Sequence, residues 1–128
     1  MRNVEMNLDE KRKYPRVMEA VSCQVRLDQK PLVTLTRNIS CGGALCELSQ
    51  KVAPMTKLDI AFELPGVSIG SADRLIRCTG VVVRQEPADS PRHYLTAIFF
   101  QSIRTQDRRR LAEFVVETML VHARRNSS

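Results

Sequence analysis

Alternation of apolar and polar residues is the feature that most limits how this chain can fold. Between residues 57 and 64, every second residue is apolar: Leu58, Ile60, Phe62 and Leu64. A period of two places these side chains on one face of an extended strand and leaves the other face polar. Pro65-Gly66 follows at once and predicts a turn. This segment is therefore expected to form a strand with one buried face.

Five further segments have a strand-like pattern. They are residues 21–27, 32–37, 44–48, 75–84 and 94–100. The sequence NISCGG predicts a turn between the second and third strands, and the breaker segment EPADSP separates the last two. No helical segment lies between the strands, which argues against a parallel α/β sheet. The pattern predicts a mainly β fold, a small six-stranded antiparallel β-barrel.

The periodicity changes near the C-terminus. A stripe at helical spacing is formed by Leu111, Phe114, Val115, Thr118, Met119 and His122. It predicts a C-terminal α-helix from about Asp107 to Arg124, with Asp107 as the N-cap. The stripe must pack against another surface, and we expect that surface to be the barrel. A second copy of the chain is the alternative.

The chain has 128 residues, the size of one domain. We divide it into a flexible N-terminal ligand-binding arm (1–16), the barrel (17–104) and the helix (105–125). Hydrophobic residues make up 43% and charged residues 27%, which is typical of a folded globular domain. No apolar run is long enough for a membrane span, and residues 1–16 lack a signal-peptide core. We therefore expect a cytoplasmic protein.

The charged and sulfur-containing residues limit the possible chemistry. Twenty Lys and Arg against fourteen Asp and Glu give a net charge of +6, which favours an anionic partner. The four cysteines form no CxxC pair and the two histidines are isolated, so we expect no metal site. We interpret all four as reduced thiols, and we expect Cys23, Cys46 and Cys78, which lie in strand-like segments, to be buried. No catalytic triad, Walker loop or HExxH motif is present, so we expect neither an enzyme nor a cofactor.

The arm carries the first candidate binding motif. Arg12 and Arg16 stand in an RxxxR spacing within the sequence KRKYPR. The forked guanidinium group suits the O6 and N7 edge of guanine and also phosphate oxygens. In an Arg-rich chain this spacing also arises by chance, as at Arg104 and Arg108. The alternative interpretation is a solvated basic leader.

The turn between the second and third strands carries the other motif. Residues 38–43 fit [D/N]xSxxG. Asn38 and Ser40 are two residues apart, so we expect their side chains to share a face. Gly42 and Gly43 permit positive φ and a close approach of the backbone to a ligand. The alternative is a hairpin turn in which Asn38 and Ser40 bond to their own backbone.

The two motifs, in this order and on this strand pattern, resemble the PilZ domain family from Lys11 to about Arg124. The resemblance implies a bacterial receptor that binds cyclic di-GMP, with its arm wrapping over the ligand. Arg12 and Arg16 then clamp guanine edges and phosphates. By the same resemblance, the side chains that reach the guanine edge, and the glycine that leaves room for the base, are Asn38, Ser40 and Gly43.

Lys11 and Lys13 flank Arg12, and we expect them to add phosphate contacts. The resemblance leaves open whether one ligand or a stacked pair binds, and whether the protein is a monomer or a homodimer. A chain without an output domain is expected to relay the signal to an effector protein or complex, in motility, polysaccharide or regulatory machinery.

Two alternatives to this function stay open. One is a PilZ-like interaction adaptor that does not bind nucleotide. The other is a small basic-barrel nucleic-acid binder that uses the net charge and the run 108–110. Six aromatic residues and no Trp provide few stacking platforms for single strands, which disfavours the second alternative.

Overall fold

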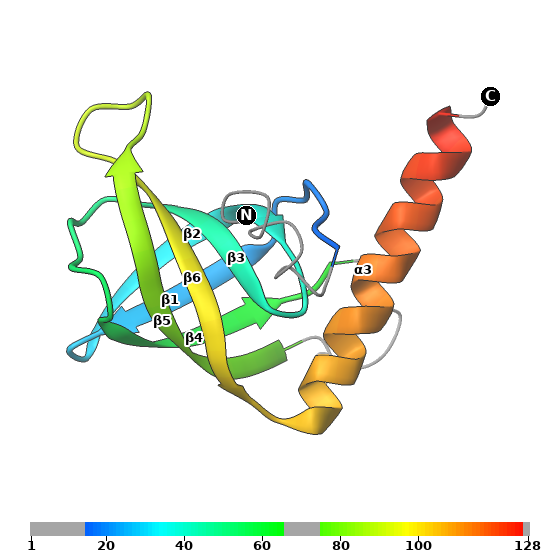
Figure 1. Cartoon of the computed structure of the whole chain (residues 1–128), viewed down its shortest axis with the longest axis horizontal. Helices are drawn as coiled ribbons and strands as arrows, with labels where there is room; N and C mark the ends of the chain where they lie inside the picture. The colour runs from blue at the N-terminus through cyan, green and yellow to red at the C-terminus, as the bar shows by residue number, and fades with distance from the viewer. Residues whose placement is uncertain (1–14, 66–74, 127–128) are drawn as a thin grey trace, which may run out of the picture.

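Six antiparallel strands form a closed barrel in the computed structural model, which describes residues 15–65 and 75–126. The strands are β1 (Ser22–Leu27), β2 (Lys30–Ile39), β3 (Gly43–Leu48), β4 (Lys57–Glu63), β5 (Leu75–Pro87) and β6 (Tyr94–Ile103). Their order around the barrel is β1-β2-β3-β6-β5-β4. One helix, α3 (Thr105–Asn126), follows β6 and lies against one side of the barrel (Figure 1). The predicted mainly β barrel with a C-terminal helix is confirmed.

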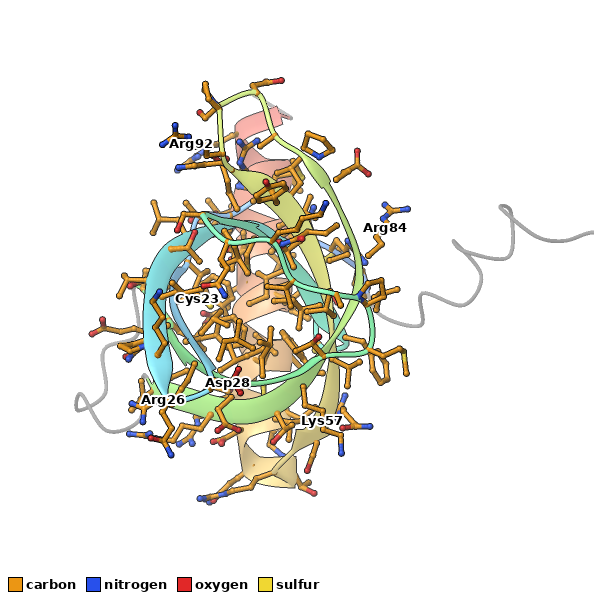
Figure 2. All side chains as sticks on the ribbon, turned by 90° about the vertical axis from the view of Figure 1, so that its left-hand side faces the viewer. Cys23, Arg26, Asp28, Lys57, Arg84 and Arg92 are labelled. Atoms are coloured by element: carbon orange, nitrogen blue, oxygen red, sulfur yellow. The ribbon has the colours of Figure 1, made fainter. Side chains whose placement is uncertain are left out.

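The barrel closes because β1 pairs along both of its edges. Cys23 lies opposite Thr34 of β2 on one side and opposite Phe62 of β4 on the other. The alternation seen in the sequence puts one face of each strand inside, where Cys23, Val25 and Phe62 are buried. Figure 2 shows Cys23 inside the ring of strands. Closure leaves no strand of the ring with an unpaired edge.

Strands β2, β5 and β6 extend two residues or more beyond their predicted ends, and β6 continues to Ile103. β5 continues to Pro87, which pairs with Tyr94, so the break predicted after Arg84 is wrong. Pairing within the β5–β6 hairpin thus overrides the local breaker residues. β2 begins at Lys30 because Asp28 and Gln29, both at positive φ, form a two-residue turn.

The start of α3 differs from the prediction. The backbone N–H of Arg108 donates to the carbonyl of Arg104 at 2.9 Å, so the helix begins at Thr105 and Asp107 is not its N-cap. Asp107 instead lies buried in the first turn, and its carboxylate pairs with Arg110. The predicted N-cap side chain, that of Asp107, is therefore bound to Arg110 within the helix instead of capping the helix start.

The predicted helical stripe is buried along half of its length. Leu111, Phe114 and Val115 are buried and belong to the hydrophobic core. Met119 is 42% exposed, so its predicted burial is wrong. Figure 1 shows why: the C-terminal half of α3 extends past the barrel. The first half of the helix therefore packs against its own barrel, as expected.

All four cysteines are free thiols, as predicted, and the predicted burial of Cys23, Cys46 and Cys78 is confirmed. Cys41, which the sequence placed in a turn, is buried as well. A hydrogen bond with Cys46, together with burial, raises the pKa of Cys23, and burial raises the pKa of Cys78 to about 12. Residues 15–65 and 75–126 contain no group of His, Cys, Asp and Glu side chains able to hold a metal ion. Within the same ranges no helix is long and apolar enough to cross a membrane.

Leu111 and Leu120 allow a direct test of how α3 is held, because they lie on one helix and differ in exposure, at 0% and 52%. Leu111→Ala removes core contacts and should lower the free energy of unfolding by about 2–5 kcal/mol. Leu120→Ala should change it by less than about 0.5 kcal/mol. Urea denaturation followed by far-UV circular dichroism measures both. Equal losses would contradict this packing of the helix.

Candidate functional site

The segment that follows the predicted arm lies beside the end of β2. Val17 and Ile39 exchange two backbone hydrogen bonds of 3.0 Å. This pairing places Arg16 next to Asn38, and Arg16 Nη1 donates to Asn38 Oδ1 at 3.1 Å. Arg16 of the first motif and Asn38 of the second motif are therefore in contact, although they are 22 positions apart in the sequence. The other predicted residues of the arm lie outside the described part of the chain: Lys11, Arg12 and Lys13.

Ser40 shapes the turn that carries the second motif. Its side chain is buried, and Oγ accepts hydrogen bonds from the N–H groups of Gly42 at 3.1 Å and Gly43 at 3.2 Å. The backbone N–H of Ser40 donates to the carbonyl of Gly43 at 2.9 Å. Ser40 is therefore buried and bonded within its own turn, whereas Asn38 is half-buried. The structure thus shows the alternative in which serine bonds to its own backbone.

Gly43 is required by the approach of a neighbouring strand. A Cβ atom at this position would lie 2.4 Å from the backbone oxygen of Ile98 in β6. Its φ lies outside the left-handed region, so the predicted use of positive φ does not apply to Gly43. The glycine thus lets β3 and β6 pair closely at the base of the turn.

Arg108 is a residue of this site that sequence reasoning missed. From the first turns of α3, its Nη1 donates to the carbonyl of Cys41 at 3.1 Å. The next carbonyl of the turn, that of Gly42, accepts from the N–H of Phe100 at 2.9 Å. Burial raises the pKa of Cys41, and the positive charge of Arg108 opposes that rise. The turn is thereby tied to both β6 and α3.

A second charged cluster joins Arg37 of β2, Glu47 of β3 and His93, the residue before β6. Arg37 Nη2 donates to Glu47 Oε1 at 2.5 Å, and His93 Nδ1 lies 2.8 Å from Glu47 Oε2. The His93 hydrogen bond, followed by that of Arg37, lowers the pKa of the Glu47 carboxyl. Arg37 is adjacent to Asn38 in sequence but is committed to Glu47. The cation that contacts the Asn38 side chain is therefore Arg16.

Comparison with protein families shows what this architecture is. The PilZ domain family matches residues 10–117, and the chain belongs to that family. The match includes both motifs and most of α3. A search of curated proteins finds no match.

Solved structures show the same fold at low sequence identity. The Bacillus subtilis inhibitor of motility (MotI/DgrA) has 22% identity and a TM-score of 0.75, covering 85% of this chain and 51% of that protein. The c-di-GMP-bound PilZ domain of YcgR from Escherichia coli has 11% identity and a TM-score of 0.67, covering 92% of this chain and 98% of that domain. The K. pneumonia MrkH–c-di-GMP complex has 17% identity and a TM-score of 0.72, covering 89% of this chain and 54% of that protein. The chain thus spans about half of MotI/DgrA and MrkH.

Substituting Gly43 tests the steric argument without any ligand. Gly43→Ala places a methyl group against the Ile98 carbonyl, and overpacking of this kind costs about 1–3 kcal/mol. We expect the urea midpoint of the ligand-free protein to fall by a corresponding amount. An unchanged midpoint would show that β6 moves away at little cost.

Proposed function

We propose that this protein is a cyclic di-GMP receptor that binds the nucleotide between its N-terminal arm and the β2–β3 turn. The observation that carries the proposal is the contact between Arg16 and Asn38, which joins the two motifs at one place on the barrel. Membership of the PilZ family supports it. So do similar folds, YcgR and MrkH, whose structures are described with c-di-GMP bound.

The chemistry of Arg16 and Asn38 suits a guanine base. A guanidinium fork donates two parallel hydrogen bonds to guanine O6 and N7, and an Asn side chain offers one acceptor and two donors. The ligand then replaces the bond between Arg16 and Asn38 with bonds to its own base. We assign Arg12 as the second clamp and Lys11 and Lys13 as phosphate contacts.

Ser40 and Gly43 have a supporting role in this proposal. The Ser40 hydroxyl holds two N–H groups of the turn, and Gly43 allows β6 to approach. Both residues therefore set the backbone on which Asn38 stands before any ligand arrives. A turn whose geometry is already set loses less conformational freedom on binding.

We propose that the signal leaves the site through α3. The Arg108 guanidinium binds the Cys41 carbonyl within the turn, while Leu111, one turn further along the helix, is buried in the core. A shift of the turn on ligand binding therefore acts directly on the start of the helix. An effector protein or complex that contacts α3 or the ordered arm would distinguish the bound from the free state.

Isothermal titration calorimetry with cyclic di-GMP tests the receptor. We expect Arg12→Ala and Arg16→Ala each to weaken binding at least about tenfold, since one Arg–guanine pair contributes about 1–3 kcal/mol. Arg84→Ala is the matched control, because Arg84 is exposed and points outward elsewhere on the barrel (Figure 2). Its affinity should equal that of the wild type.

Two further titrations define specificity. GTP and cyclic di-AMP should not compete, because neither presents two guanines on a ring closed by two phosphodiester groups. If folded protein gives neither heat nor a thermal shift with cyclic di-GMP, the receptor function is rejected. The interaction adaptor that does not bind nucleotide is then the remaining PilZ-like function. Binding of single-stranded DNA that falls steeply with salt would instead favour the nucleic-acid binder.

Arg108 provides a test of the route through α3. Arg108→Gln should reduce hydrogen-exchange protection in the turn and diminish the changes that cyclic di-GMP causes in α3 amides, because a hydrogen bond from a charged group contributes about 1.5–3 kcal/mol. Arg109→Gln is the control, since Arg109 is the exposed neighbour with the same charge. Identical exchange profiles for the two variants would argue against the route.

A further inference from the structure

An open hollow of about 450 Å³ lies on the outer face of the barrel, across β1, β4, β5 and the end of β6. Strand register explains how it is lined. Arg26 of β1 lies opposite Asp59 of β4, which in turn lies opposite Thr79 of β5. None of these residues belongs to the β2–β3 turn, so the hollow is a separate surface of the molecule.

A small side chain forms part of the base of the hollow. In the adjacent row of the sheet, Ala61 of β4 lies between Gln24 of β1 and Arg77 of β5. The methyl group of Ala61 is flanked on both sides by long polar side chains that line the same hollow. This difference in length leaves space at the centre of a polar face.

Three exposed arginines line the hollow from three separate segments. Arg26 comes from β1, Arg77 from β5, and Arg104 from the junction of β6 and α3. Among the described residues that line it, Asp59 is the one acidic side chain. Arg26 and Arg77 form no ion pair with any residue in 15–65 or 75–126, and Arg104 donates to Gln106 Oε1 at 3.2 Å. The surface therefore presents an excess of positive charge at a concave site.

The lining distinguishes between classes of anionic partner. A guanidinium fork binds carboxylates and phosphates with two parallel hydrogen bonds. No aromatic side chain from residues 15–65 or 75–126 lines the hollow, so these residues offer no platform on which a nucleic-acid base could stack. The Asp59 carboxylate also repels a continuous phosphate backbone, whereas a polypeptide can present an N–H or a cation to it. Charge complementarity thus favours a protein segment over a nucleic acid.

We propose that this hollow is a docking site for an acidic segment of a partner protein, with carboxylates bound by Arg26 and Arg77. Arg104 places the site directly before α3, so a docked segment lies next to the start of the helix. The proposal requires no nucleotide and stands whether or not the protein binds cyclic di-GMP.

The test uses a fluorescein-labelled Glu-rich peptide and fluorescence anisotropy at low salt. Arg26→Gln/Arg77→Gln should weaken peptide binding by about tenfold or more, because it removes two fork-type contacts. Arg84→Gln/Arg92→Gln is the control, since it removes the same charge from exposed arginines that point outward elsewhere (Figure 2). The control should bind the peptide within about twofold of the wild type if the site rather than net charge is responsible.

Two-dimensional NMR with the same peptide should shift the backbone amides of Thr79 and Ser102, which line the hollow. Equal weakening by the two double variants, or no binding at low salt, would overturn the proposal. So would displacement of the peptide by inorganic phosphate at equal concentration. A single-stranded oligonucleotide of matched charge is compared with the peptide. If it binds more tightly than the peptide and Arg26→Gln/Arg77→Gln abolishes that binding, the partner is a nucleic acid and not a protein segment.

Discussion

Pairing of β1 with both β2 and β4 is the constraint on which the rest of this structure depends. It closes the sheet, so the inner face of every strand is buried and the outer face becomes a continuous curved surface. The β2–β3 turn is consequently held at one place on the ring, and the start of α3 packs beside it through Leu111 and Arg108. Both the turn and the outer hollow are therefore formed by a rigid scaffold rather than by separate loops.

Backbone groups dominate the organisation of the β2–β3 turn. Ser40 accepts from two N–H groups, Arg108 holds the Cys41 carbonyl, and β6 approaches so closely at Gly43 that a Cβ atom has no room. Unpaired backbone groups are costly when buried, so each of these contacts stabilises one conformation of the turn. The motif residues thus combine two duties, since Asn38 and Arg16 face outward while Ser40 and Gly43 maintain the backbone beneath them.

Much of the fold could be predicted because strand burial has a period of two. The alternation around Ile60 and Phe62 identifies a half-buried strand, and the neighbouring strand β1 follows the same rule. Predictions from local sequence were wrong where pairing or packing with other parts of the chain determines the structure. Pro87 continues β5 because Tyr94 pairs with it, and Met119 is exposed because the barrel ends before the helix does. The resemblance assigned Arg16 and Asn38 to one ligand, but their direct contact is seen only in the structure. Arg108 gave no signal beyond a spacing that chance also produces.

By itself, the sequence determined the fold class, the six strands, the C-terminal helix and the positions of both motifs, because periodicity and turn chemistry are local properties. The tertiary structure alone decided which side chains meet. Ser40 bonds to its own backbone, Gly43 allows the approach of β6, and Arg26 and Arg77 line one hollow from either side of β4. These relations depend on register and closure, which are set by contacts between residues far apart in the chain, and a linear pattern carries no information on such distances.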